Sequence, residues 1–337
     1  MSFFPPQSSK PRSTRLKLAI GGLVLGTTLG ASASALAQSE DYPAKDIKLV
    51  IPFGPGGATD IIFRLVSQEA EKNLDQSIVP VNMQGAGATR GSREVKNADP
   101  DGYTLLGSHD TIALSKLAGM VDYSYSAFEP IALLTQTVNI PTTYADHEVK
   151  SAKGIAQYVN ENPGDVRVGI IPSSTDHFFW IQFFESAGIP LENVRLVSYP
   201  DTGSQVSALL AQEIDFTMLN MPSGGSFFEE GSFRPLGVAY DERLDALPDT
   251  PTLKEQGIDL VNATSRGLFA PKGTPDDKIQ VIADAYEKAL ENETVVSRIE
   301  NEFGSVVNYK SPDDYQQFLS DNEAALTKVA ENIDFSK

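Results

Sequence analysis

The stretch Ile47-Lys48-Leu49-Val50-Ile51-Pro52-Phe53-Gly54-Pro55-Gly56-Gly57-Ala58-Thr59-Asp60 decides the fold of this chain. An apolar run breaks into a turn rich in glycine and proline, and the turn opens a segment with helical spacing of apolar residues. This order predicts a buried strand, a tight loop and the start of a helix. The first N–H groups of a helix have no partner inside it and favour negative charge, so the loop is a candidate anion site. It is not a P-loop, because no Gly-Lys-Ser/Thr closes it.

A second glycine-rich loop follows at residues 82–91 and includes Gly87 and Arg90. Arg90 is the one basic residue in the candidate site loops of the sequence, and a guanidinium can hold a carboxylate through two parallel hydrogen bonds. It is therefore the candidate for binding a second carboxylate of a ligand. The alternative is a solvent-facing helix residue paired with Glu94, four residues on. The sequence leaves these two interpretations open.

Strand-like and helix-like segments alternate along the rest of the chain. Strands are predicted at Ile47–Phe53, Ile78–Asn82, Tyr103–Gly107, Val166–Ile171, Val194–Tyr199, Phe216–Asn220 and Pro235–Tyr240. Helices are predicted at Thr59–Asn73, Thr89–Asn97, Ala152–Asn160, Thr175–Ala187 and Ser204–Gln212, with three more near the C-terminus. This alternation predicts an α/β fold with mostly parallel sheets that helices cover on both faces.

The length of the chain exceeds what one such sheet accommodates, which favours two domains. We expect the chain to change domain around Ala145–Lys150 and to return around Asn262–Phe269. Domain 1 then comprises residues 38–145 and 263–337, and domain 2 comprises residues 146–262. Two crossings of this kind predict a hinge with a cleft between the domains.

Residues 1–37 have the pattern of a secretory signal peptide. Four basic residues precede an apolar, glycine-rich stretch, and Ala35-Leu36-Ala37 is a cleavage motif, so we expect cleavage after Ala37 and a periplasmic location. The chain contains no cysteine, so neither a lipid anchor on cysteine nor a disulfide is expected.

The charge of the mature chain excludes one class of partner. Removing the leader lowers Lys plus Arg from 27 to 23 against 45 Asp plus Glu, a net charge near −22. Nucleic-acid binding requires a basic face, so it is not expected. A bound anion must instead be held by local dipoles. The three histidines, His109, His147 and His177, are too scattered to predict a metal site.

Six motifs in this order resemble the Bug-type periplasmic receptors of tripartite tricarboxylate transporters. They are Tyr42-Pro43-Ala44-Lys45-Asp46-Ile47, the loop at residues 52–60, the turn at residues 82–91, Pro100-Asp101-Gly102-Tyr103-Thr104-Leu105-Leu106, Leu247-Pro248-Asp249-Thr250-Pro251-Thr252-Leu253-Lys254-Glu255-Gln256-Gly257 and Gly267-Leu268-Phe269-Ala270-Pro271-Lys272-Gly273-Thr274-Pro275. The resemblance implies a type II periplasmic-binding-protein fold with two hinged α/β domains. It implies a receptor that captures a small mono-, di- or tricarboxylate and delivers it to membrane permease subunits. No cofactor and no membrane insertion of the mature chain are implied, and we expect a monomer.

The same resemblance implies that backbone groups and ordered waters hold a ligand carboxylate between two loops, residues 53–60 and residues 171–177. The second loop departs from the family pattern at Pro172 and Asp176, and the loop at residues 82–91 departs at Met83, Gln84 and Arg90. Thr59 is expected to cap its helix, and Asp60 to stabilise the helix start. The predicted ligand-binding residues are Phe53, Gly54, Gly56, Gly57, Ala58, Thr59, Gly87, Arg90, His109, Ser173, Ser174, Thr175, Thr202 and Gly203.

Several interpretations compete with these. His109 follows a predicted strand, where ligands bind in open α/β sheets, but a helix-capping cluster explains it equally well. Ser173, Asp176 and His177 contain the residue types of a catalytic triad, yet they fall on one turn and lack a nucleophile elbow, so we reject catalysis there. The alternative functions are an exported α/β hydrolase-like enzyme and a carboxylate-sensing receptor feeding a sensor kinase. An aromatic cluster, Phe179, Trp180, Phe183 and Phe184, is predicted to be core.

Overall fold

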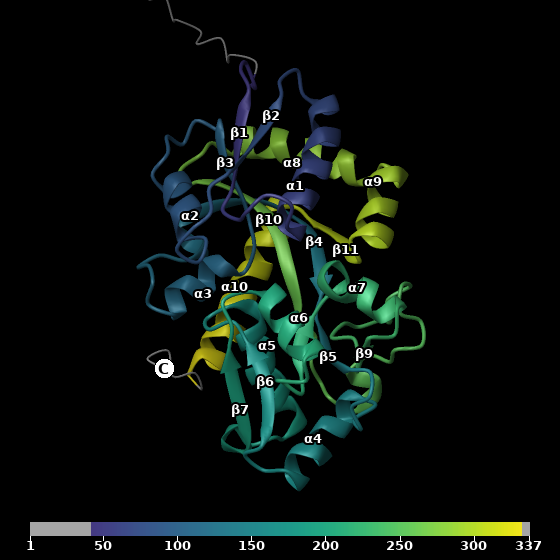
Figure 1. Cartoon of the computed structure of the whole chain (residues 1–337). Coiled ribbons are helices and arrows are strands. Elements are labelled where there is room, and N and C mark those ends of the chain that lie inside the picture. Colours follow the sequence, from purple (N-terminus) through teal and green to yellow (C-terminus); the bar gives the residue numbers. More distant parts are fainter. Residues whose placement is uncertain (1–41, 332–337) are drawn as a thin grey trace, which may run out of the picture. The chain divides into compact units, whose positions relative to one another are not determined.

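The computed structural model describes residues 42–331, so the predicted signal peptide at residues 1–37 lies outside the described residues. The chain folds as a mixed α/β protein (Figure 1). Its strands are β1 Ile47–Ile51, β2 Ile78–Asn82, β3 Thr104–Ser108, β4 Phe128–Val138, β5 Ile140–Tyr144, β6 Val166–Ile170, β7 Val194–Ser198, β8 Thr217–Leu219, β9 Phe233–Pro235, β10 Ala263–Pro271 and β11 Ser305–Lys310. Its α-helices are α1 Ala58–Ala70, α2 Thr89–Lys96, α3 Thr111–Leu117, α4 Ala152–Glu161, α5 Thr175–Ala187, α6 Thr202–Leu210, α7 Met221–Glu229, α8 Asp276–Leu290, α9 Glu293–Ser297 and α10 Pro312–Ala330.

The largest sheet has the strand order β11-β4-β10-β3-β1-β2. Strands β1, β2 and β3 are parallel, whereas β10 is antiparallel to both β3 and β4, and β11 is antiparallel to β4. The expectation of mostly parallel sheets was therefore wrong for this half. The cause is the long pair β4 and β10, two extended segments more than a hundred residues apart that βαβ reasoning does not anticipate.

Alternating side chains place a core on each face of this sheet. Leu49 and Ile51 of β1, with Leu268 of β10, pack in the cluster that contains α1 and α8. Val50 and Phe269, one residue along on the same strands, pack in the other cluster with α3 and α10. Because successive strand residues point to opposite faces, helices cover both sides as predicted.

The segment between β4 and β10 builds two smaller sheets. Strands β8-β5-β9 form an antiparallel sheet, and β6 pairs with β7 in parallel. The Gly169 N–H of β6 donates to the Phe216 carbonyl at 2.9 Å and joins the two sheets. The strand predicted at Pro235–Tyr240 does not form, because the last residue of β9 is Pro235 and the chain then leaves the sheet.

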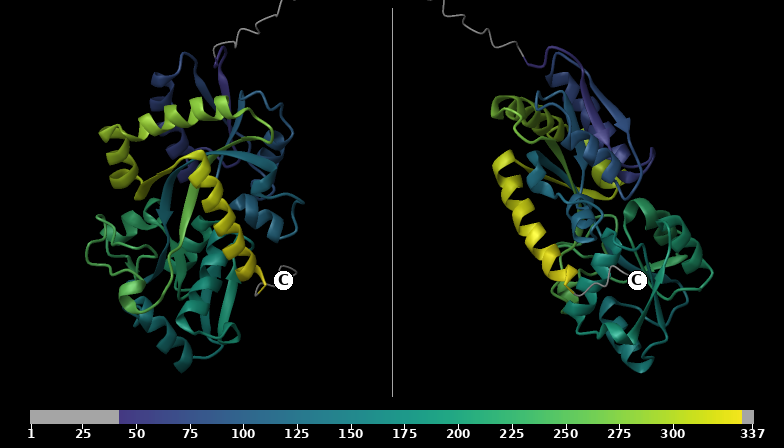
Figure 2. Two further views of the ribbon diagram at one scale, coloured as in Figure 1. Left: turned by 180° about the vertical axis from the view of Figure 1, so that it is seen from behind. Right: turned by 90° about the vertical axis from the view of Figure 1, so that its left-hand side faces the viewer.

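Helices α4 and α5 cover this second region, and the aromatic cluster of α5 is core as predicted. Phe179, Trp180 and Phe183 are fully buried, and the Trp180 and Phe184 rings stack with centroids 5.4 Å apart. The long helix α10 packs against β4 of the large sheet and also against α5 (Figure 2). The chain passes from the large sheet to the small ones at Asn139 and returns at Asn262.

Candidate ligand-binding site

A pocket of about 480 Å³ lies where the N-termini of α1, α5, α6 and α7 converge. Both sheet regions contribute to it, and β10 and the segment before β11 complete its wall. Each helix N-terminus presents unpaired N–H groups and a partial positive charge, so their convergence favours an anion. The lining residues are Gly56, Gly57, Ala58, Ile61, Ile171, Ser174, Thr175, Asp176, Thr202, Met218, Asn220, Pro222, Ser223, Thr264, Glu302 and Phe303.

The first wall is the loop that the sequence singled out. Gly57 is the N-cap of α1, and Gly56 has a positive φ of 81°, a conformation that glycine adopts without strain. Thr59 was expected to cap α1, and that expectation was wrong because the helix begins one residue before it, at Ala58. Thr59 is instead buried in the first turn, where its hydroxyl oxygen accepts a hydrogen bond from Arg266 Nε at 3.0 Å.

Asp60 holds this loop in shape, as predicted for a residue that stabilises the helix start. Its carboxylate accepts hydrogen bonds from the Gly56 N–H at 2.9 Å, from Asn82 Nδ2 at 2.8 Å and from Arg64 Nε at 2.8 Å. Burial raises the pKa of Asp60, but these three donors outweigh it and hold the pKa below the ordinary value. The negative charge of Asp60 is therefore compensated by these three donors.

The second wall is the loop before α5. Asp176, the residue that departs from the family pattern, accepts hydrogen bonds from the Ile171 N–H at 2.9 Å, from Gln205 Nε2 at 2.7 Å and from the Ser174 hydroxyl. Burial raises its pKa. Ser174 is the N-cap of α5, and Ser173 has a positive φ of 61°, which is uncommon outside glycine and shows that this turn is held tightly.

The remaining walls come from α6 and α7. Asp201 caps α6 by accepting from the Ser204 N–H at 2.8 Å, and Thr202 faces the pocket. Asn220 and Ser223 form a reciprocal capping box at the start of α7, with Pro222 in its first turn. Sequence reasoning missed Asn220, Pro222 and Ser223 as site residues, although an Asn followed two residues later by Pro is a readable helix-start signal.

The pocket contains some of the predicted site residues and not others. Gly56, Gly57, Ala58, Ser174, Thr175 and Thr202 line it. Phe53, Gly54, Thr59, Gly87, Arg90, His109, Ser173 and Gly203 do not. Thr264, Glu302 and Phe303 line it without having been predicted, because they come from segments more than 200 residues after the first loop.

The loop at residues 82–91 packs beside the first loop. The Gly87 carbonyl accepts from the Ser115 hydroxyl at 3.2 Å, and a Cβ on Gly91 would lie 2.7 Å from Pro52 Cβ. Arg90 is exposed, and the predicted alternative in which it pairs with Glu94 was wrong, since Glu94 pairs with Lys48 at 3.1 Å. Arg90 and Glu94 are four residues apart on α2, which is a suitable spacing for an ion pair. Glu94 pairs instead with Lys48 of the neighbouring strand β1.

His109 packs against Phe53 of the first loop and does not line the pocket. Its ring stacks on Phe53 with centroids 4.5 Å apart, and it is almost fully buried. Burial, with the positive charge of Arg266, lowers its pKa well below the ordinary value, so the imidazole is neutral at pH 7. The helix-capping interpretation is not supported, because the N-cap of α3 is Asp110 and no side chain caps that helix.

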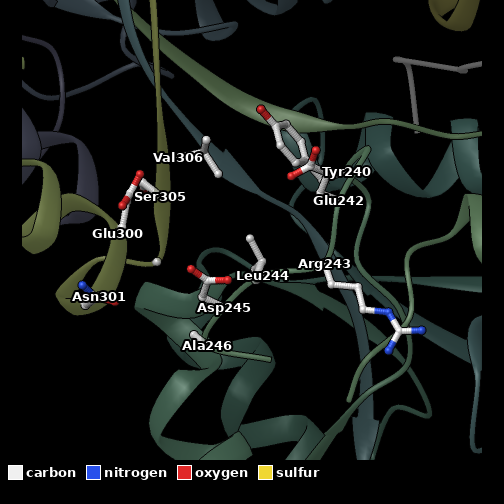
Figure 3. Close-up of a pocket in the computed structure, with 11 residues that line it drawn as sticks. Tyr240, Glu242, Arg243, Leu244, Asp245, Ala246, Glu300, Asn301, Ser305 and Val306 are labelled. Atoms are coloured by element: carbon white, nitrogen blue, oxygen red, sulfur yellow. The ribbon is translucent and has the colours of Figure 1, made fainter. Parts of the chain in front are cut away.

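A second pocket, of about 200 Å³, has the wrong charge for an anion (Figure 3). Glu242, Asp245 and Glu300 belong to its lining, whereas the Arg243 guanidinium points away from it and pairs with Glu255 at 2.8 Å. Carboxylates in its wall would repel a bound carboxylate.

The pocket at the helix N-termini also has two carboxylates in its lining, but each is compensated. Asp176 accepts hydrogen bonds from the Ile171 N–H and from Gln205. Glu302 pairs with Arg298 at 3.0 Å. Electrostatics therefore favour that pocket.

The family model for the tripartite tricarboxylate transporter family receptor matches residues 62–335. The chain belongs to this family. Among its relatives is BugT of Bordetella pertussis, 27% identical over 91% of this chain and 94% of that protein. A solved structure described as a periplasmic transporter is 30% identical and has a TM-score of 0.74, over 86% of this chain and 97% of that one. MatC from Rhodopseudomonas palustris with bound malate is 26% identical with a TM-score of 0.72, over 86% and 100% of the two chains.

The family assignment confirms the resemblance read from the motifs, and the matches to solved structures, among them the periplasmic binding protein BugD, confirm the periplasmic-binding-protein fold. Between residues 42 and 331 we find no helix with the length and apolarity needed to span a bilayer. In the same range, no group of three His, Cys, Asp or Glu side chains is arranged to bind a metal.

Proposed function

We propose that this receptor captures a small organic carboxylate in the pocket at the N-termini of α1, α5, α6 and α7. The convergence of these helix N-termini carries the proposal, because it supplies N–H donors and positive potential at one place in an acidic protein. The malate bound to MatC supports a carboxylate as the ligand class. In this proposal the ligand contacts the backbone N–H groups of Gly57 and Ala58 and the hydroxyl groups of Thr175 and Thr202. The Gly56 N–H and the Ser174 hydroxyl already donate within their own loops and shape the pocket.

The family assignment extends the proposal to the partner and the location. The mature chain starts after Ala37 in the periplasm and delivers its ligand to permease subunits of a tripartite tricarboxylate transporter. The two regions that the chain connects at Asn139 and Asn262 close around the ligand. We keep the two expected domains and move the first boundary from residue 145 to Asn139, because β5 pairs in the small sheet. Mass spectrometry of the exported protein tests the leader, since the mature N-terminus should be Gln38. An intact N-terminus would contradict it.

The geometry argues against the enzyme alternative. The Ser174 hydroxyl donates to the Ile171 carbonyl at 2.8 Å and contacts Asp176, and His177 Nδ1 accepts from the Ser173 N–H at 3.3 Å. No hydrogen bond within the described residues therefore joins a serine hydroxyl to His177, and a general base needs that contact. We propose that the receptor performs no chemistry on its ligand.

A thermal-shift screen tests the proposed ligand class. A ligand at about 100 times its Kd stabilises a protein by roughly 2.7 kcal/mol, enough to detect. Malate, adipate and citrate represent the acids, and glucose and putrescine are the neutral and cationic controls. We expect stabilisation by at least one acid and by neither control. Stabilisation by glucose without any acid response would refute the assignment.

Incubation of the receptor with carboxylate esters and amides tests the enzyme alternative directly. We expect no turnover. Turnover that is lost in Ser174→Ala would show catalysis and contradict the proposal. Transport is tested separately, by comparing acid uptake in cells with and without the receptor.

A further inference from the structure

Arg266 is a buried cation without an ion-pair partner, directly behind the pocket wall. It lies on β10, and its side chain is almost fully buried. The guanidinium donates from Nε to Thr59 Oγ1 at 3.0 Å, from Nη1 to the Thr264 carbonyl at 3.4 Å and from Nη1 to the Thr137 hydroxyl. All three acceptors are neutral oxygens. Within residues 42–331, no carboxylate lies close enough to this guanidinium to form an ion pair.

A buried charge of this kind is unfavourable unless something compensates it. Removing an ion from water requires a nearby opposite charge or a full set of hydrogen bonds. Burial lowers the pKa of Arg266 to about 10, so the group stays charged at neutral pH. The charge of Asp110 raises the pKa of Arg266, but the Asp110 carboxylate accepts its hydrogen bonds from the Ser265 N–H at 3.2 Å and from Asn322 Nδ2 at 2.9 Å. Asp110 therefore compensates the charge only from a distance.

Two of the three residues that accept hydrogen bonds from Arg266, Thr59 and Thr264, lie at the wall of the pocket. Thr59 follows Ala58 in the first turn of α1, and Ala58 lines the pocket. Thr264 lines the pocket itself, and its carbonyl accepts from Arg266. The guanidinium thus lies one residue layer behind the wall formed by α1 and β10. It adds a full positive charge to the partial charges of the helix N-termini in a site of low dielectric.

We propose that Arg266 is the counter-charge of the bound carboxylate, a positioning and specificity-determining residue that acts through Thr59 and its electric field without touching the ligand. This proposal rests on the proposed function. The ligand completes the charge balance that the apo protein lacks, so the residue selects acids over neutral molecules of the same shape. The other site loops provide neutral donors or carboxylates already engaged in hydrogen bonds, so they cannot replace this charge.

The test compares acids with their neutral amides. Binding of malate, adipate and citrate is measured by calorimetry, and binding of the corresponding amides by displacement of the acid. The measured quantity is the ratio of the amide Kd to the acid Kd. Arg266→Gln should reduce this ratio on the order of tenfold, as expected for removing a unit charge close behind the wall. Arg266→Lys, which keeps the charge, should retain most of the ratio.

Arg93→Gln is the matched control, because it removes the same charge from an exposed position on α2 that does not line the pocket. It should leave the ratio unchanged. A purely structural role of Arg266 would weaken acid and amide equally and leave the ratio at its wild-type value, which would overturn the proposal. If the wild-type receptor binds none of the acids, the proposed function fails instead.

Folding of the variants is checked by thermal unfolding without ligand. A buried cation that only the distant Asp110 compensates should not stabilise the apo protein, so Arg266→Met should unfold at the wild-type temperature or higher while losing acid selectivity. Such opposite effects on stability and binding support the proposal and are not expected of a structural residue. If neither Arg266→Gln nor Arg266→Met folds, the fold itself needs the guanidinium before any anion binds, and the proposal is overturned.

Discussion

Asn139 and Asn262 are hydrogen-bonded side by side at the two places where the chain passes between the large sheet and the small sheets. The Asn139 side-chain amide donates to Asn262 Oδ1 at 2.5 Å, and the Asn139 N–H donates to the Asn262 carbonyl at 3.2 Å. Asn139 separates β4 from β5, and Asn262 directly precedes β10. We propose that these two adjacent crossings act as the pivot of the receptor, because the pocket lies between the segments that they connect.

This arrangement predicts closure on ligand binding. A ligand that contacts both α1 and α5 binds better when their N-termini are close, so it shifts the equilibrium toward the closed form. Small-angle scattering should give a smaller radius of gyration with a saturating acid than without it. Glucose at the same concentration is the control. An unchanged radius in the presence of a bound acid would show that the receptor is rigid or already closed.

Gly56→Ala should weaken ligand binding as well as stability. Gly56 has a φ of 81°, which is unfavourable for a residue with a Cβ by roughly 1–2 kcal/mol, and its N–H anchors the loop on Asp60. Relief of that strain would distort the lining of the pocket. We expect the unfolding free energy to fall by about 1 kcal/mol and the Kd for an acid to rise by about tenfold or more.

Gly119→Ala is the matched control for this substitution. Gly119 has a similar φ of 69°, no atom within 4 Å of the added Cβ, and no place in the pocket lining. It should show the loss of stability without the loss of affinity. Equal affinity losses in both variants would mean that general destabilisation, and not loop geometry, weakens binding.

Asp110 should give the receptor a distinctive dependence of stability on pH. Burial raises the pKa of Asp110 from 3.8 to about 6. The folded state therefore binds this proton more tightly than the unfolded state. The stability that Asp110 contributes is greatest below pH 4 and falls as the pH rises toward 6, on the order of 2–3 kcal/mol in all. Asp110→Asn, which cannot ionise, should remove this part of the pH profile.

The measurement is the free energy of unfolding in urea at closely spaced pH values from 4 to 8. Subtracting the wild-type profile from that of Asp110→Asn should leave a difference that grows between pH 4 and 6 and is constant above. The control is Asp99→Asn, an exposed position on the surface. A flat difference for Asp110→Asn would show that its burial does not perturb ionisation in solution.

The strands that the sequence predicted and the ones it missed differ in their physical basis. Strand β1 is predictable from the sequence because the strand is buried on both faces, so Leu49, Val50 and Ile51 form a continuous apolar run. Strand β4 contains Thr135-Gln136-Thr137 just before its last residue, Val138, and both threonines are fully buried although they are polar. Their burial comes from pairing with β10 and β11, segments distant in sequence, so no local pattern predicts it.

The residues of the site also differ in whether a local sequence pattern predicts them. Glycine and hydroxyl residues at helix starts predicted Gly56, Gly57, Ser174 and Thr202, because the anion-binding property of a helix N-terminus is local. Arg266 was missed because its role depends on what surrounds it. On an isolated strand an arginine indicates solvent, and only the packing of β10 against the first turn of α1 buries it beside Thr59.

The position of Arg90 in the structure differs from the role that the sequence predicts for it. In the sequence it is the one cation of the candidate loops, whereas in the structure its side chain is exposed and lies outside the pocket lining. Its guanidinium forms no ion pair within the described residues. We expect Arg90→Ala to raise the Kd of mono- and dicarboxylates alike by less than about threefold, through long-range attraction alone.

The comparison with Arg93→Ala isolates any direct contact. Arg93 is exposed on the same helix, so both substitutions remove one charge at a similar depth from the surface. In calorimetry at two ionic strengths, the two variants should match each other, and both effects should shrink at high salt because exposed charges are screened. If Arg90→Ala alone weakens adipate by tenfold or more, and leaves a monocarboxylate of similar length unaffected at both salt concentrations, Arg90 reaches the second carboxylate when the receptor closes. That result would show that Arg90 belongs to the ligand-binding site, as the sequence predicted.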